Sequence, residues 1–114
     1  MAKLALQVTP EGVVTELDIS SNALNVLQTA VDGLIEAVDL TNELTLWVNE
    51  EGLLRSDLKP NLIPEAFYSS PIMGTVVFTG GTDDEGETLG LDPKSAASIE
   101  RVFQSFRDVL TELN

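Results

Sequence analysis

The sequence contains neither cysteine nor histidine. Without cysteine the chain has no disulfide, no thiolate metal ligand and no cysteine nucleophile, so its stability must come from packing. Without histidine it lacks the usual general base near neutral pH and the commonest metal ligand in proteins. These absences exclude hydrolases with a Ser-His pair and zinc sites built from cysteine and histidine. We therefore expect a protein that is not an enzyme and that carries no cofactor or metal.

Basic residues are scarce as well, because 6 Lys and Arg stand against 19 Asp and Glu, which gives a formal net charge of -13. Phosphate contacts need clustered Lys and Arg, so the composition predicts no direct binding to nucleic acid and none to anionic membranes. The functional interpretation of this charge is a partner protein with a basic surface. The simpler interpretation is solubility.

Long apolar runs are also missing. No segment approaches the roughly 20 apolar residues that span a bilayer, and the first ten residues lack the pattern of a secretory signal, so we expect a cytoplasmic protein. The 114 residues are 43% hydrophobic and 22% charged, which is enough apolar content for one buried core. This predicts a single compact domain over residues 1–114, present as a monomer or a small homo-oligomer.

Apolar periodicity and turn residues predict the order of the secondary structure. The expected strands are residues 4–8, 13–19, 34–40, 44–49 and 75–79, with Leu53-Leu54 as a short additional strand. A first helix follows a cap at Ser20 or Ser21 and ends at Gly33. The continuous apolar run at 75–79 is typical of a central strand buried on both faces. The expected fold is α+β, a mostly antiparallel sheet of about five strands with two helices packed on one face.

The second helix carries one continuous apolar stripe. Asp92 is its expected N-cap and Pro93 its first residue, because the fixed φ and missing N–H of proline suit that position. The stripe consists of Ala96, Ile99, Phe103, Phe106, Leu110 and Leu113. Such a stripe fits a helix that lies across a sheet or one that pairs with a second copy of itself. Packing on the sheet is favoured because the sheet otherwise lacks a cover.

Residues 80–88 combine two glycines with four carboxylates, those of Asp83, Asp84, Glu85 and Glu87. Glycines after a strand are typical of a phosphate cradle, but no helix with a lysine follows them. The carboxylates offer oxygen ligands for Ca²⁺, but their spacing does not match the helix-loop-helix calcium motif. We interpret the segment as a solvated hairpin tip, and we expect its carboxylates to contribute to an acidic partner-binding surface.

Trp47 is a second candidate for partner binding. It lies on the less apolar face of the strand at residues 44–49, and aromatic residues are enriched at binding hot spots. The alternative interpretation is that Trp47 lies beneath a loop or a helix.

Residues 55–71 form a proline-containing excursion between two strands, and long ordered loops often carry function. They offer an alternative site, a pocket for a small anionic ligand such as a nucleotide. Arg55 and Lys59 would pair with phosphate there. Asn61 and Ser70 would hydrogen-bond to the ligand, and Tyr68 would stack on a base. The simpler interpretation of Arg55 and Lys59 is that these exposed cations offset neighbouring carboxylates.

Several short pieces of the chain, taken in order, resemble a known family. They are residues 31–38 (VDGLIEAV), 46–52 (LWVNEEG), 59–61 (KPN), 66–68 (AFY) and 71–77 (PIMGTVV). Together they are similar to domain-of-unknown-function family 3846, small proteins of phages, plasmids and some bacteria, over roughly residues 30–80. The resemblance supplies no catalytic residues. It implies an accessory protein of a mobile genetic element that binds something belonging to the host. Taken with the acidic residues, this leads us to expect a protein that binds and inhibits a host protein in the host cytoplasm, for example a defence or nucleic-acid-handling factor. A nucleotide-binding protein that uses the pocket at residues 55–71 is the alternative that the residues leave open.

Overall fold

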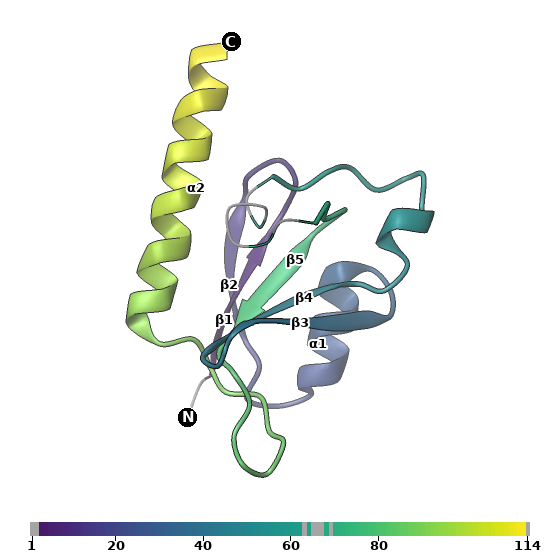
Figure 1. Cartoon of the computed structure of the whole chain (residues 1–114), viewed down its shortest axis with the longest axis vertical. Coiled ribbons are helices and arrows are strands. Elements are labelled where there is room, and N and C mark those ends of the chain that lie inside the picture. The colour runs from purple at the N-terminus through teal and green to yellow at the C-terminus, as the bar shows by residue number, and fades with distance from the viewer. Residues whose placement is uncertain (1–2, 63, 65–67, 69, 114) are drawn as a thin grey trace.

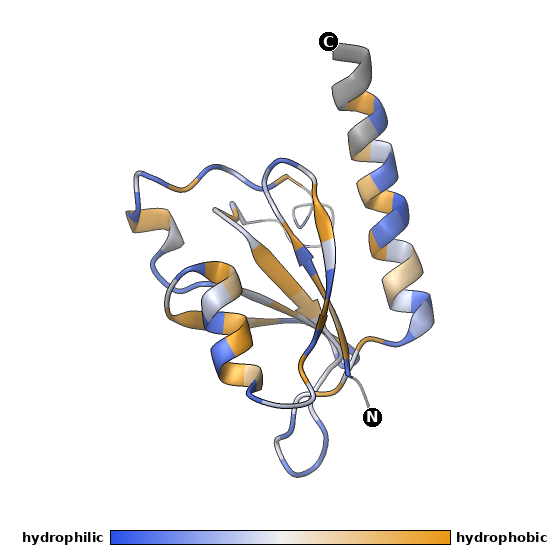
Figure 2. Ribbon diagram, turned by 180° about the vertical axis from the view of Figure 1, so that it is seen from behind, coloured by the Kyte–Doolittle hydropathy of each residue, from blue (hydrophilic) through white to orange (hydrophobic). Residues whose placement is uncertain are grey.

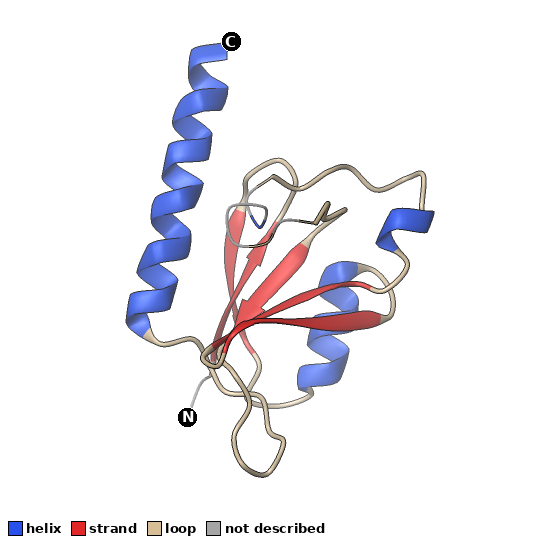
Figure 3. Cartoon of the chain, viewed as in Figure 1, coloured by secondary structure: helices blue, strands red, loops and turns tan. Residues whose placement is uncertain are grey.

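The computed structural model describes residues 3–62, 64, 68 and 70–113. In this part the chain folds into one five-stranded antiparallel sheet and two α-helices (Figure 1, Figure 3), which confirms the expected α+β class. The strands are β1 (Leu4–Val8), β2 (Val14–Asp18), β3 (Ile35–Thr41), β4 (Leu44–Asn49) and β5 (Val76–Thr79). The helices are α1 (Ala23–Val31), α2 (Pro93–Leu113) and the short 3-10 helix η1 (Gly52–Leu54). Neither α-helix in the described part combines the length and the apolarity that crossing a membrane requires.

β5 lies at the centre of the sheet, whose order is β2-β1-β5-β4-β3. All four residues of β5 are buried, which confirms the predicted central strand. Phe78 pairs with Leu6 of β1 on one side and with Leu46 of β4 on the other, so these three side chains stand in a row on one face. β1 and β2, which follow each other in the chain, pair as an antiparallel hairpin in which Ala5 lies opposite Leu17.

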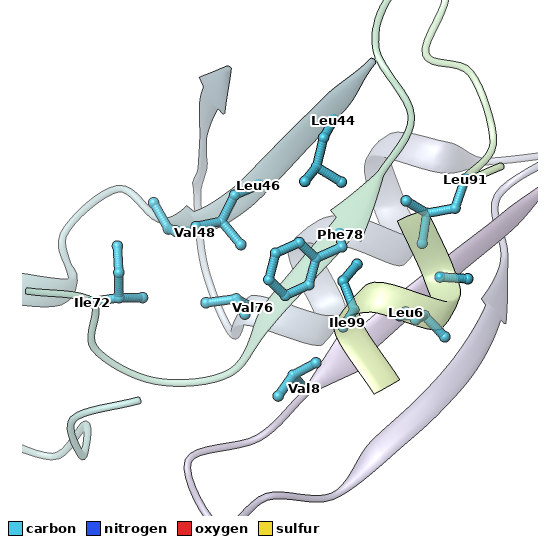
Figure 4. Packing of buried hydrophobic residues seen from close by; sticks show 11 residues of the cluster. Leu6, Val8, Leu44, Leu46, Val48, Ile72, Val76, Phe78, Leu91 and Ile99 are labelled. Atoms are coloured by element: carbon cyan, nitrogen blue, oxygen red, sulfur yellow. The ribbon is translucent and has the colours of Figure 1, made fainter. Parts of the chain in front are cut away.

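The two α-helices lie on opposite faces of the sheet (Figure 1), so the expectation that both pack on one face is wrong. α1 packs through Leu27 on the face that carries Ala5 and Val77. α2 packs through Ile99 on the face that carries Phe78. Because successive strand residues point to opposite faces, Val77 and Phe78 need separate covers. The larger of the two resulting core clusters, with Phe78 in its middle, is shown in Figure 4.

α1 begins without the predicted serine cap. Its first turn follows Asn22, which has a left-handed φ of 55° and makes no side-chain cap hydrogen bond, so the caps expected at Ser20 or Ser21 are wrong. The helix ends near the expected residue, since the N–H of Gly33 donates to the carbonyl oxygen of Gln28 at 3.1 Å. Such a backward hydrogen bond satisfies a carbonyl that the last helical turn leaves free.

The segment expected as a short additional strand is helical. Leu53 and Leu54 belong to η1, in which the N–H of Leu54 donates to the carbonyl oxygen of Glu51 at 2.9 Å. Gly52 is buried against Met73, where a side chain on Gly52 would contact the backbone of Met73. The chain after β4 therefore forms a 3-10 turn, and Leu53 and Leu54 do not extend along the sheet as a strand.

α2 begins as the sequence predicts. The N–H of Ser95 donates to Oδ1 of Asp92 at 2.9 Å, the hydrogen bond of an N-cap, and Pro93 is the first helical residue. This hydrogen bond from the Ser95 N–H lowers the pKa of Asp92 below its usual value.

The apolar stripe of α2 packs on the sheet over the first half of the helix. Its buried members are Ala96 and Ile99, its half-buried members are Phe103 and Phe106, and the side chains of Leu110 and Leu113 fall outside the described residues. The rings of Phe103 and Phe106 lie beside the β1–β2 turn, since a Cβ placed on Gly12 would contact both of them. The C-terminal end of α2 rises beyond the sheet (Figure 1). Packing on the sheet is therefore confirmed for the described part of the stripe.

Candidate functional site

Residues 82–88 form a hydrophilic loop at one end of the sheet (Figure 2). Thr82 and Thr88 form an isolated antiparallel bridge, and the N–H of Asp83 donates to the carbonyl oxygen of Glu87 at 2.9 Å. Oδ1 of Asp83 accepts hydrogen bonds from the N–H groups of Glu85 and Glu87, each at 2.9 Å. The loop is a hairpin tip closed by its own hydrogen bonds, as expected, and its four carboxylates are exposed.

Gly80 and Gly81 lie where two backbone segments come close, which explains both glycines without a phosphate. A Cβ on Gly80 would collide with the carbonyl oxygen of Gly90, and a Cβ on Gly81 would collide with that of Asn42. The N–H of Gly80 donates to the carbonyl oxygen of Leu89 at 3.0 Å, so this amide is already used. The contact between Gly81 and Asn42 also places the β3–β4 turn beside the loop.

Two acidic residues of the β3–β4 hairpin join the loop carboxylates at this end of the sheet. Asp39 lines a polar depression of about 410 Å³ together with Gly81 and Thr82, and Glu43 lies in the β3–β4 turn. We call the six exposed carboxylates the acidic end: Asp39, Glu43, Asp83, Asp84, Glu85 and Glu87.

One described lysine borders the acidic end. Nζ of Lys3 donates to the carbonyl oxygen of Thr88 at 3.2 Å. Among the described residues, no group of three or more acidic side chains is placed to hold a metal ion. The six carboxylates of the acidic end are all exposed, so their negative charge faces solvent.

Trp47 does not belong to the acidic end. Its side chain is half-buried in the core cluster under α1, and its Nε1 donates to Oγ1 of Thr79 at 2.9 Å. Trp47 thus has the covered position that was the alternative to a surface anchor. A contact between Trp47 and a partner stays a prediction.

The two cations expected in the anionic pocket are engaged with carboxylates. Arg55 donates to both carboxylate oxygens of Asp57 and lies 3.0 Å from Oδ2 of Asp32. The hydrogen bond from Arg55 lowers the pKa of Asp57, and the hydrogen bonds to Asp57 and Asp32 raise the pKa of Arg55. Nζ of Lys59 lies 3.8 Å from Oε2 of Glu11. Both cations offset neighbouring carboxylates, which is the simpler of the two interpretations.

Asn61 is buried inside the fold, away from any ligand in solvent. Its side chain is 0% exposed, and its Nδ2 donates to the carbonyl oxygens of Val8 at 3.0 Å and Gly74 at 2.9 Å. Its Oδ1 has no hydrogen-bond partner among the described residues. Asn61 ties the connection between β4 and β5 to the end of β1, which is a structural role.

Tyr68 and Ser70 line a groove of about 440 Å³ on the α2 face of the sheet, over β3 and β4. The described lining residues are Glu36, Val38, Val48, Asn49, Glu50, Gly52, Leu53, Leu54, Tyr68, Ser70, Pro71, Ile72 and Met73. Arg55, Lys59 and Asn61 do not line this groove, so the five residues of the predicted anionic pocket do not converge.

Sequence reasoning missed the leucines and glutamates of the groove. Leu53 and Leu54 were assigned to a strand, although two adjacent leucines after a turn cannot both face the core of a sheet. These two adjacent leucines are the feature of the sequence that indicates an exposed apolar site. Glu36 and Glu50 could not be singled out from the sequence, because the chain contains many acidic residues.

Comparisons with known proteins place the chain in a family. No curated protein and no solved structure matches the chain. Residues 2–104 match the family described as Domain of unknown function (DUF3846), so the match extends on both sides of residues 30–80 and takes in the acidic end and the first half of α2. The expected resemblance is thereby confirmed, and the chain belongs to the DUF3846 family.

Proposed function

We propose that this protein binds a partner with a basic surface through the acidic end and does so without catalysing a reaction. The observation that carries the proposal is that the β3–β4 turn lies beside residues 82–88. Six exposed carboxylates therefore lie together at one end of the sheet. Complementary charge speeds the encounter of two proteins and selects the partner. The net charge of -13 adds attraction at longer range.

The proposed partner is a host protein, because the resemblance to phage and plasmid proteins implies such a setting. Proteins that handle nucleic acids present clustered lysine and arginine to phosphate groups. An acidic end that occupies such a cluster would block the nucleic acid and thereby inhibit the host protein.

An anionic small ligand has less support from the geometry. The pocket proposed for it depends on Arg55 and Lys59, and both lie against carboxylates. The groove that Tyr68 and Ser70 line contains glutamates and no described lysine or arginine. Phosphate would meet repulsion there.

The test is a titration against a protein purified from the host by its affinity for this chain. We expect binding to weaken steeply as salt rises from about 50 to about 300 mM, because this range shortens the Debye length and screens exposed charge. The variant Asp84→Asn, Glu85→Gln, Glu87→Gln should lose about tenfold or more in affinity. The host protein's own activity, measured with and without this chain, reports inhibition.

The matched control removes three carboxylates elsewhere, in the variant Glu16→Gln, Glu100→Gln, Asp108→Asn. All three residues are exposed and lie outside the acidic end, and the net charge changes by the same amount. This control should keep most of the affinity. Equal losses in both variants would show that total charge, not the acidic end, drives binding, and binding that ignores salt would contradict the proposal.

A further inference from the structure

We infer that the groove between β3 and η1 docks an apolar segment of another protein that carries lysine or arginine beside its apolar side chains. The inference goes beyond the proposed function, since it concerns the opposite end of β3 and β4 from the acidic end and depends on other residues.

The groove has an apolar floor on the sheet. Val48 and Ile72 are 8% and 6% exposed and belong to the core cluster around Phe78, and Val38 packs against that cluster. α2 reaches the same face through Ile99, but the described part of α2 contributes no residue to the groove. Within the described part of the chain, no α-helix therefore covers the β3 and β4 side of this face.

The rim of the groove is apolar and strongly exposed. Leu53 is 72% exposed and Leu54 is 85% exposed, and both lie in η1, which Figure 2 shows as a short apolar turn at the outer edge of the molecule. Single exposed leucines are ordinary, but adjacent ones on the rim of a concave apolar site are typical of an interaction surface.

Charge specifies the partner. Glu36 and Glu50 line the groove, and no lysine or arginine is among its described lining residues. Arg55 lies just after η1, but it is held by Asp57 and Asp32. An apolar segment with basic flanks would bury its apolar side chains on the floor and place its cations against the two glutamates.

The size and the charge of the site exclude two other occupants. A small apolar ligand inside the groove would leave the rim leucines in water, whereas a protein segment covers floor and rim together. A second copy of the chain would bring its own net charge of -13 to an acidic rim. Like charges brought together at an interface disfavour association.

The experiment selects peptides from a random display library on the full chain. Selected peptides should combine two or more large apolar residues with neighbouring lysine or arginine. Replacing those lysines and arginines by glutamate should weaken binding about tenfold or more. In NMR spectra the bound peptide should shift the amides of Gly52, Leu53 and Leu54 and leave the amides of α1 in place.

Variants test the groove directly. The double variant Leu53→Ser, Leu54→Ser should lose about tenfold or more in peptide affinity while keeping its melting temperature, because both side chains are exposed in the free protein. The matched control Leu24→Ser removes a leucine that is 60% exposed on α1 and should bind the peptide normally. The variant of the acidic end, Asp84→Asn, Glu85→Gln, Glu87→Gln, should also keep the peptide, which separates this inference from the proposed function.

Three results would overturn the inference. Selected peptides that lack basic residues would remove the charge argument. Peptide affinity that survives Leu53→Ser, Leu54→Ser would place the binding elsewhere. A dimer in sedimentation that this double variant dissociates would show that a second copy, not a foreign segment, fills the groove.

Discussion

At the scale of single residues, one buried amide holds the connection between β4 and β5 against the sheet. Asn61 is fully buried, and its Nδ2 bridges the carbonyl oxygens of Val8 and Gly74. We expect Asn61→Ala to lower the free energy of unfolding by about 1–3 kcal/mol, because two buried carbonyl groups lose their donor. Urea unfolding followed by circular dichroism measures the change.

Asn25→Ala is the matched control for Asn61→Ala. Asn25 is exposed on α1, where it accepts a hydrogen bond from Thr29, so its removal should change the free energy of unfolding by less than about 0.5 kcal/mol. Equal stability of Asn61→Ala and the wild type would show that the Asn61 hydrogen bonds add nothing to the fold.

At the scale of elements, strands with a clear pattern were predictable and local turn geometry was not. β4 has the predicted bounds, and the Asp92-Pro93 start of α2 is confirmed, because both depend on local rules of alternation and capping. Before α1 a left-handed Asn22 stands in place of the serine cap, and the pattern of cap residues and apolar positions does not specify that conformation.

The sides on which the helices pack could have been predicted more fully. The expected burial of β5 on both faces already requires a cover on each face, and the sequence predicts two helices to supply them. The candidate site was harder to predict. The sequence identifies the carboxylates of residues 83–87 as a candidate site. It does not show that Asp39 and Glu43 lie near them, because this depends on the long-range contact between Gly81 and Asn42.

α2 should contribute to stability mainly through its first half. Ile99 is 0% exposed in the core, whereas Val109 is 52% exposed further along the same helix. We expect Ile99→Ala to cost about 2–5 kcal/mol in the free energy of unfolding and Val109→Ala less than about 0.5 kcal/mol. Urea unfolding of both variants tests this. Similar costs for the two would mean that α2 does not use its first half as the cover of the sheet.

At the scale of the whole molecule, negative charge is the property that both binding sites share. The acidic end carries six carboxylates, and the groove at the other end of β3 and β4 adds Glu36 and Glu50. Among the described residues, the ion pairs are those of Arg55 with Asp32 and Asp57 and of Lys59 with Glu11. Most of the acidic side chains therefore repel one another through solvent, and this repulsion acts against the compact state.

This repulsion predicts that salt stabilises the fold. The melting temperature should rise by about 4 °C, the shift that roughly 1 kcal/mol gives in a domain near this size, between about 20 and about 300 mM NaCl. Salt also weakens the ion pairs of Arg55 and Lys59, but these exposed pairs are few against an excess of 13 negative charges. Calorimetry at constant pH 7 measures the shift.

The variant Asp84→Asn, Glu85→Gln, Glu87→Gln has three fewer negative charges. At low salt it should melt at a higher temperature than the wild type, and its melting temperature should rise less when salt is added. A melting temperature that falls with added salt would show that the local ion pairs outweigh the repulsion among the excess carboxylates, and would contradict this prediction.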